Sequence, residues 1–169
     1  MSRKVVRAAV ANWIAQAQIT NLNQVLTSFP KTMSFQVNSF PGQQSRAVGV
    51  VFIENESENR IAIGGVGDLP EGLGKGWKRV DYGVAFQVYL HSQQRNTEDA
   101  MDDFDNVIDA IKDRIRAGQH TLGETDPNLI WQAAEPFIDV SYSEPLVRDN
   151  GATEIWAAIR FTVTQMIES

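Results

Sequence analysis

The chain has 169 residues, of which 43% are hydrophobic and 21% are charged, a composition typical of one globular domain. It contains no cysteine, which excludes disulfides, thiolate metal sites and cysteine nucleophiles. The net charge of −6 argues against a protein that wraps nucleic acid with a basic surface, and no apolar run approaches the roughly 20 residues that span a bilayer.

Residues 3–17 predict an amphipathic helix, with Ser2 placed to cap its start. Three basic residues, Arg3, Lys4 and Arg7, lie near the positive end of the helix dipole, where cations are unfavourable. We interpret them as a solvated face, with contact to an acidic partner surface as the alternative. The apolar positions recur at helical spacing: Val6, Ala9, Val10, Trp13, Ile14 and Ala17.

The next stretch predicts a connection and then a hairpin. Residues 19–45 are rich in polar residues and proline, with a short strand expected at Ser34–Asn38. Residues 46–54 form a β-rich run, the polar segment Glu54–Asn59 follows, and apolar residues resume at Ile61. This pattern predicts two strands joined by a turn in the polar segment.

Residues 64–78, GGVGDLPEGLGKGWK, form a glycine-rich arm that holds six of the twelve glycines. Fixing each backbone residue costs roughly 1–2 kcal/mol, so an isolated chain gains little by ordering such a segment. We expect the arm to become ordered on assembly, with Leu69, Leu73 and Trp77 as apolar anchors.

Residues 80–91 alternate strictly and predict the clearest strand of the chain. One face is expected to carry Val80, Tyr82, Val84, Phe86, Val88 and Leu90, and the opposite face Asp81, Gly83, Ala85, Gln87, Tyr89 and His91.

Residues 97–117 predict the clearest helix, capped by Asn96 or Thr97 and followed by Gly118. Its apolar stripe is Met101, Phe104, Ile108, Ile111 and Ile115. By the same periodicity, the acidic residues of its first half lie on the solvent face: Glu98, Asp99, Asp102, Asp103 and Asp105.

Two further segments complete the fold. Residues 129–142 contain Pro136 and predict a broken or edge strand, and residues 154–167 predict a second alternating strand. No repeat or linker divides residues 1–169. We therefore predict a single α+β domain, a mixed and mainly antiparallel sheet with two helices packed on one side.

The sequence has no pattern typical of a catalytic or ligand-binding site. The arm lacks a phosphate-binding pattern, because Gly74–Lys75 is followed by Gly76 and not by Ser or Thr. His91 and His120 lack metal-ligand spacing and are expected to face solvent, and the pair of acids at Glu124 and Asp126 lacks the spacing of a calcium loop. The sequence therefore predicts no catalytic, cofactor or metal residues.

Apolar residues that need a covering surface are the better candidates for function. In the arm, Leu69, Leu73 and Trp77 stand among glycines, and Trp156 points away from the apolar face of the last strand. Exposed aromatics often anchor interfaces. We predict these four residues to contribute to an assembly interface.

The order of elements resembles a known family. A strand (YGVAFQVYLHSQQ) is followed by an acidic helix (TEDAMDDFDNVIDAIKDRIRAG) and the sequence HTLG, and a late strand (EIWAAIRFTVTQMI) ends the chain. This arrangement, over residues 1–168, resembles the tail terminator, or tail completion, proteins of long-tailed bacteriophages. It rests on element order, without an invariant motif.

The resemblance implies a virion protein made in the bacterial cytoplasm, without catalysis or cofactor, assembled as a hexameric ring. Such a ring caps the tail tube, ends its polymerisation and meets a head-completion protein, while genome DNA passes through without specific binding. The acidic charge suits a passage that DNA crosses without adhering. Three alternatives remain: another head–tail connector, a monomeric bacterial binding domain, and a small-ligand enzyme.

Overall fold

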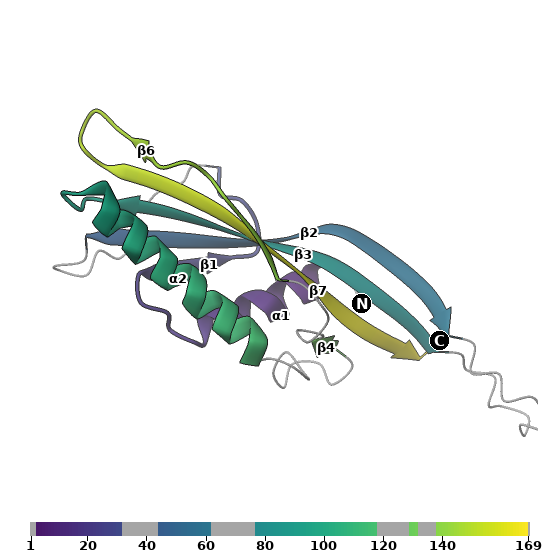
Figure 1. Ribbon diagram of the computed structural model, residues 1–169. Helices are drawn as coiled ribbons and strands as arrows, with labels where there is room; N and C mark the ends of the chain where they lie inside the picture. The colour runs from purple at the N-terminus through teal and green to yellow at the C-terminus, as the bar shows by residue number, and fades with distance from the viewer. Residues whose placement is uncertain (1–2, 32–43, 62–76, 118–128, 132–137, 169) are drawn as a thin grey trace, which may run out of the picture.

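The computed structural model describes residues 3–31, 44–61, 77–117, 129–131 and 138–168. Two helices and a seven-stranded sheet make up the described part of the chain (Figure 1). In order these are α1 (Arg3–Ala15), β1 (Leu22–Leu26), β2 (Ser45–Ile61), β3 (Trp77–Ser92), α2 (Thr97–Ala117), β4 (Leu129–Trp131), β5 (Asp139–Tyr142), β6 (Leu146–Val147) and β7 (Thr153–Glu168).

The sheet is mixed and mainly antiparallel, which confirms the predicted fold class. Its order is β1-β2-β3-β7-β4, and β5 and β6 also pair with β7. Among the described strands, the β1–β2 pair is parallel and every other pair is antiparallel. Because β4 and β5 both pair with β7 on the same edge, the prediction of a broken edge strand in residues 129–142 is confirmed.

The predicted hairpin turn at Glu54–Asn59 is wrong. Strand β2 runs through this segment to Ile61, paired with β3 along its whole length except for a bulge between Ile53 and Asn55. The polar residues 55–59 form strand because they pair with β3, and side-chain contacts add to this; Lys78, for example, lies 3.0 Å from Glu58. Beyond the bulge, residues 55–61, 77–83 and 162–168 form a three-stranded extension that reaches past the helices (Figure 1), and the short strand β4 pairs with its β7 edge.

The core lies between one face of the sheet and both helices, as predicted. The inward residues of β3 and β7 form its floor, and Phe86, Ile159 and Val163 are fully buried. Gly49 makes room for Phe86, since a Cβ at this position would lie 2.1 Å from the Phe86 Cζ atom. A side chain on residue 49 would therefore displace the Phe86 ring from the sheet's inner face.

Helix α2 begins and ends where the sequence predicts, and Phe104, Ile108, Ile111 and Ile115 are buried. Met101 is the exception, because it is 43% exposed while Ala100 takes the buried position one residue earlier. The apolar stripe therefore starts at Ala100. Met101 faces outward beside it.

The expectation that all acidic residues of α2 face solvent is wrong for Asp103. This carboxylate is half-buried and accepts hydrogen bonds from the Ser45 hydroxyl and, at 3.1 Å, from the Gln94 amide. The Ser45 hydroxyl also bonds to Ser92 at 2.8 Å, and both serines are buried. Asp103 thus fastens the first half of α2 to the adjoining ends of β2 and β3.

The basic residues of α1 are not a uniformly solvated face. Arg3 is exposed but forms an ion pair with Glu56 of the three-stranded extension, with Nε 3.1 Å from Oε2. Arg7 is half-buried, and Lys4 is exposed. Residues Ser2, Ser34–Asn38 and Gly118, for which the sequence predicts a cap, a strand and a helix stop, lie outside the described residues.

Candidate functional site

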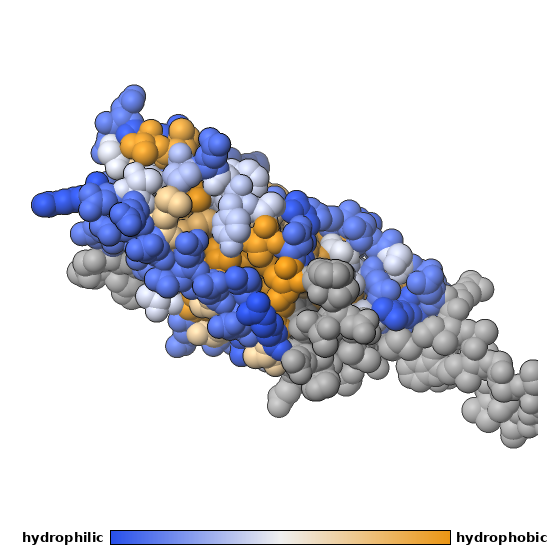
Figure 2. All heavy atoms as spheres, viewed as in Figure 1, coloured by the Kyte–Doolittle hydropathy of each residue, from blue (hydrophilic) through white to orange (hydrophobic). Residues whose placement is uncertain are grey.

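Large apolar side chains are exposed at the β5–β6 edge of the sheet. We call Met101, Tyr142, Leu146 and Val147 the β5-edge surface; Tyr142 is the most prominent ring, at 54% exposure. Figure 2 shows apolar side chains, in orange, both over β6 and along the line between α2 and the strands. Exposed side chains of this kind, gathered in one place, are typical of a surface that another molecule covers.

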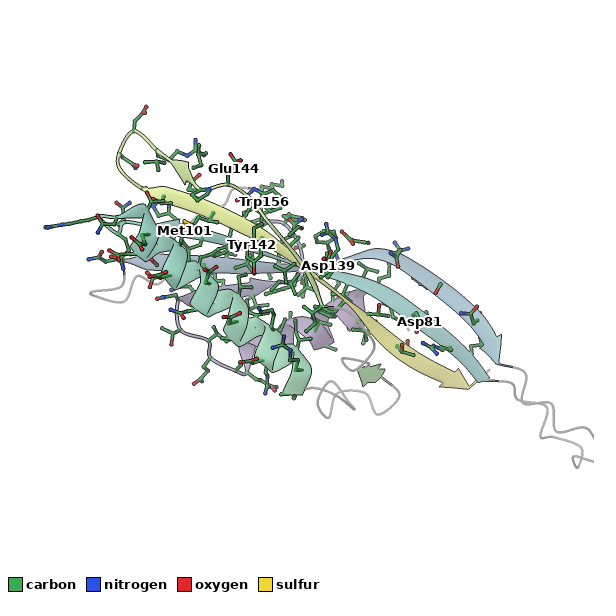
Figure 3. The ribbon with its side chains drawn as sticks, in the orientation of Figure 1. Asp81, Met101, Asp139, Tyr142, Glu144 and Trp156 are labelled. Carbon is green, nitrogen blue, oxygen red and sulfur yellow. The ribbon has the colours of Figure 1, made fainter. Side chains whose placement is uncertain are left out.

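A groove lies within this surface, between α2 and the segment that carries Tyr142 (Figure 3). Its volume is about 470 Å³. The Tyr142 ring stands edge-on to the buried Phe104 ring, with centroids 6.4 Å apart, so its position is held by the core. The groove, called here the α2–β5 groove, is lined by Met101, Phe104, Asp105, Asp109, Tyr142, Ser143, Pro145 and Ile155.

The rim of the groove is acidic. Asp109 is paired with Lys112 at 2.6 Å, and the hydrogen bond from Lys112 to Asp109 raises the pKa of that ammonium. Asp105 is exposed, and the structure gives it no ion pair within the described residues. The rim therefore keeps one uncompensated carboxylate, at Asp105, beside an apolar lining.

The opposite edge of the sheet carries a second exposed aromatic residue. Phe29 follows β1, is 50% exposed, and packs on Phe52 of β2 with ring centroids 5.6 Å apart. Lys31 is exposed two residues later, and Pro30 between them restricts the backbone of this segment. We call Phe29, Lys31 and Phe52 the β1-edge surface.

Of the four interface residues predicted from sequence, the structure places two, Trp77 and Trp156, and these lie far apart along the sheet. Leu69 and Leu73 lie outside the described residues, and Trp77 is the first residue of β3, at the far end of the three-stranded extension. Trp156 is 44% exposed on the sheet face that neither helix covers, opposite Tyr89 of β3. Trp77 and Tyr89 are twelve residues apart on one strand, roughly 40 Å.

Sequence reasoning missed Phe29, Met101 and Tyr142. The apolar pattern assigns Met101 to the core, and Tyr142 is read as part of a broken strand. A signal was available for Phe29, which stands before Pro30 in a polar stretch where no strand or helix pattern buries it.

The sheet face away from the helices is closed by polar contacts. Arg160 donates to both carboxylate oxygens of Glu54 at 3.1 Å and to the Ser141 hydroxyl at 3.0 Å. Burial raises the pKa of the Tyr89 phenol, which donates to Gln87 at 2.6 Å. These groups satisfy one another, while Trp156 on the same face is exposed.

The residues weighed for catalysis are not gathered into a site. His91 is half-buried rather than solvent-facing, with Nδ1 3.7 Å from Glu154 and Nε2 3.1 Å from the Gln93 amide. His120, Glu124 and Asp126 lie outside the described residues. Within the described part, no three His, Cys, Asp or Glu side chains are grouped to hold a metal ion.

None of the described helices is long and apolar enough to span a bilayer.

Comparisons with known proteins find distant structural matches. No protein-family model and no curated protein matches the chain. A chain of the virion of a native gene transfer agent particle is 12% identical, with a TM-score of 0.32 over 94% of both chains. A chain from the sheath/tube terminator of an extracellular contractile injection system, in its extended state, is 10% identical, with a TM-score of 0.37.

The second match covers 96% of this chain and 57% of the other, so this chain spans little more than half of that protein's length. Matches with TM-scores this low carry no argument about function.

Proposed function

We propose that the chain is a non-enzymatic virion assembly protein that forms a closed ring on the end of a tail tube. The ring ends tube polymerisation and joins the tail to the head-completion and portal complex. The order of elements, which resembles tail terminator proteins, suggests this class of function. The observation that carries the proposal is the presence of two different exposed aromatic surfaces on opposite edges of one sheet.

Ring geometry accounts for these two surfaces. Each subunit in a closed ring of more than two copies contacts its neighbours through two different, complementary surfaces. The β1-edge surface, with Phe29, and the β5-edge surface, with Tyr142, lie at the two ends of the strand order β1-β2-β3-β7 followed by β5. A monomer would leave both in water.

The charge of the chain suits a passage for DNA. Six copies would carry 6 × (−6) = −36 formal charges. A basic passage would bind phosphates by counterion release, whereas an acidic one repels the duplex. We expect no measurable affinity for duplex DNA near physiological salt in a fluorescence anisotropy titration.

Electron microscopy of the purified protein, alone and with tail tubes, tests the proposal. The expected result is a ring, six-fold in the favoured form, on one end of the tubes, with shorter tubes when the protein is present during polymerisation. Rings that bind a portal complex but leave tube length unchanged would indicate another head–tail connector. A protein that stays monomeric and ignores tubes would be a binding domain of another kind, and the proposal would fail.

A further inference from the structure

The α2–β5 groove has an apolar lining and one uncompensated acid, so its occupant should offer an apolar group beside a cation. Segment 29–31 of the same chain offers this pair, with the exposed Phe29 ring followed by the exposed Lys31 ammonium. Aromatic rings are common anchors of protein interfaces, where they enter pockets on the partner. The groove volume of about 470 Å³ falls within the range of roughly 300–1,000 Å³ of pockets that bind drug-sized molecules.

Phe29 is held ready for such a contact. Its ring rests on Phe52 at 5.6 Å, and Pro30 fixes one backbone dihedral of the segment. A side chain that is already held loses little conformational freedom on binding, so more of the interaction energy appears as affinity.

The same chain cannot fill its own groove with Phe29. Phe52, on which Phe29 rests, belongs to β2, and β3 and β7 separate β2 from β5. Three strand spacings amount to roughly 14 Å. A Phe29 ring in the groove would therefore have to come from a second copy.

We infer that Phe29 of one copy occupies the α2–β5 groove of the next copy, with Lys31 facing Asp105 across the contact. This inference rests on the proposed ring and names its subunit contact. Because the donor and the acceptor lie on opposite edges of the sheet, each copy can give one contact and receive one. The contact therefore repeats around a ring.

Covalent capture tests the contact. The chain has no cysteine, so an introduced pair reports its own proximity alone. In the double variant Lys31→Cys with Asp105→Cys, which keeps Phe29 and Tyr142, mild oxidation of the assembled protein should give a ladder of disulfide-linked copies on a non-reducing gel. Each single variant should give at most a dimer. A disulfide requires Cα atoms within about 7 Å, so a bond within one copy is excluded by the separation of the edges.

A charge exchange tests the ion pair. Lys31→Glu and Asp105→Lys should each weaken ring assembly at least about tenfold in a concentration series, because like charges then face each other. The double variant should restore assembly, since its charges are opposite again. Lys4→Glu is the matched control for Lys31→Glu, because it makes the same change in net charge at an exposed position of α1. It should leave assembly unchanged.

The outcomes separate the contact from the ring. Rings that form on tubes, give no disulfide ladder, and respond equally to Lys31→Glu and Lys4→Glu would overturn the inference and leave the proposed function standing. If the unsubstituted protein forms no ring on tubes, the proposed function fails and the inference fails with it. Because Lys31 and Asp105 are exposed, each variant should keep the melting temperature of the parent, which circular dichroism checks.

Discussion

Trp13 of α1 and Arg114 of α2 bind each other by three contacts. The Trp13 indole N–H donates to the Arg114 carbonyl oxygen at 3.0 Å, and Arg114 Nε donates to the Trp13 carbonyl oxygen at 2.8 Å. The Arg114 guanidinium also lies over the Trp13 ring, 3.6 Å from its centroid. The arginine thus places a cation at the C-terminal end of α1, where the helix dipole favours it, and ties the two helices together.

Arg114→Ala should lower the free energy of unfolding by about 1–3 kcal/mol, because it removes one hydrogen bond and a cation–π contact. Trp13→Phe keeps an aromatic ring but loses the indole donor, and should cost about 0.5–1.5 kcal/mol. Urea unfolding of both single variants and the double variant gives the coupling between them. Strictly additive losses would mean that the two residues act independently.

Asp103→Ala should lower the free energy of unfolding by about 1–3 kcal/mol, because Ser45 and Gln94 lose their shared acceptor. Asp102→Ala, at the neighbouring exposed position, is the matched control and should stay within about 0.5 kcal/mol of the parent. Thermal unfolding of the two variants provides the comparison. Equal melting temperatures would show that the buried serine cluster contributes nothing.

Gly49→Ala should destabilise the domain by about 1–3 kcal/mol, because the new methyl group occupies the place of the Phe86 ring. Phe86→Leu removes the tip of that ring and costs stability by itself. If the clash is the cause, the double variant should lose less than the sum of the two single losses. A double-variant loss equal to that sum in denaturant unfolding would contradict this account.

Stability should fall as pH rises above about 10, in part through Tyr82. Burial raises the pKa of this phenol above its ordinary value of 10.0; Glu56 and Glu58 raise it further, and Arg3 opposes them. The folded state therefore keeps a proton that the unfolded state releases, so the stabilisation present below the unfolded pKa is lost above it.

Tyr82→Phe removes this titration together with the hydrogen bond to Gln165. The variant should be less stable near neutral pH, and the gap to the parent should narrow as pH rises through about 10. Unfolding curves at about pH 8 to about pH 11 measure that gap. A gap that stays constant over this range would assign the alkaline loss to other groups.

The parts of this fold that the sequence predicts are those whose residue pattern lies within one short segment. Helix α2 is predictable to its end residues because its stripe, its charge order and the Asn96 cap all lie within one segment; the Asn96 carbonyl accepts from Ala100 at 3.3 Å. Strand β3 is equally local, since strict alternation identifies both of its faces.

The second half of β2 is different. Residues 54–59 resemble a turn because they are polar, and their strand conformation depends on partners in β3 such as Lys78. The candidate interface has the same limitation. Whether Tyr142 and Phe29 are exposed depends on whether another element covers them. Tertiary packing decides this, and the local sequence pattern does not.

The bulge at Glu54 changes which residues of β2 face the helices. Before it, odd-numbered residues of β2 such as Val51 share the helix side with Phe86; after it, even-numbered residues such as Glu56 share that side with Tyr82. Removing Glu54 itself would restore regular alternation, so that Asn55 would still face Gly83 and Glu56 could still meet Arg3, and the contact from Arg160 to Glu54 would be lost. Lengthening all three strands beyond the bulge by two residues would keep every orientation. The reach of the extension can thus change in two-residue steps while the helix-covered core stays the same.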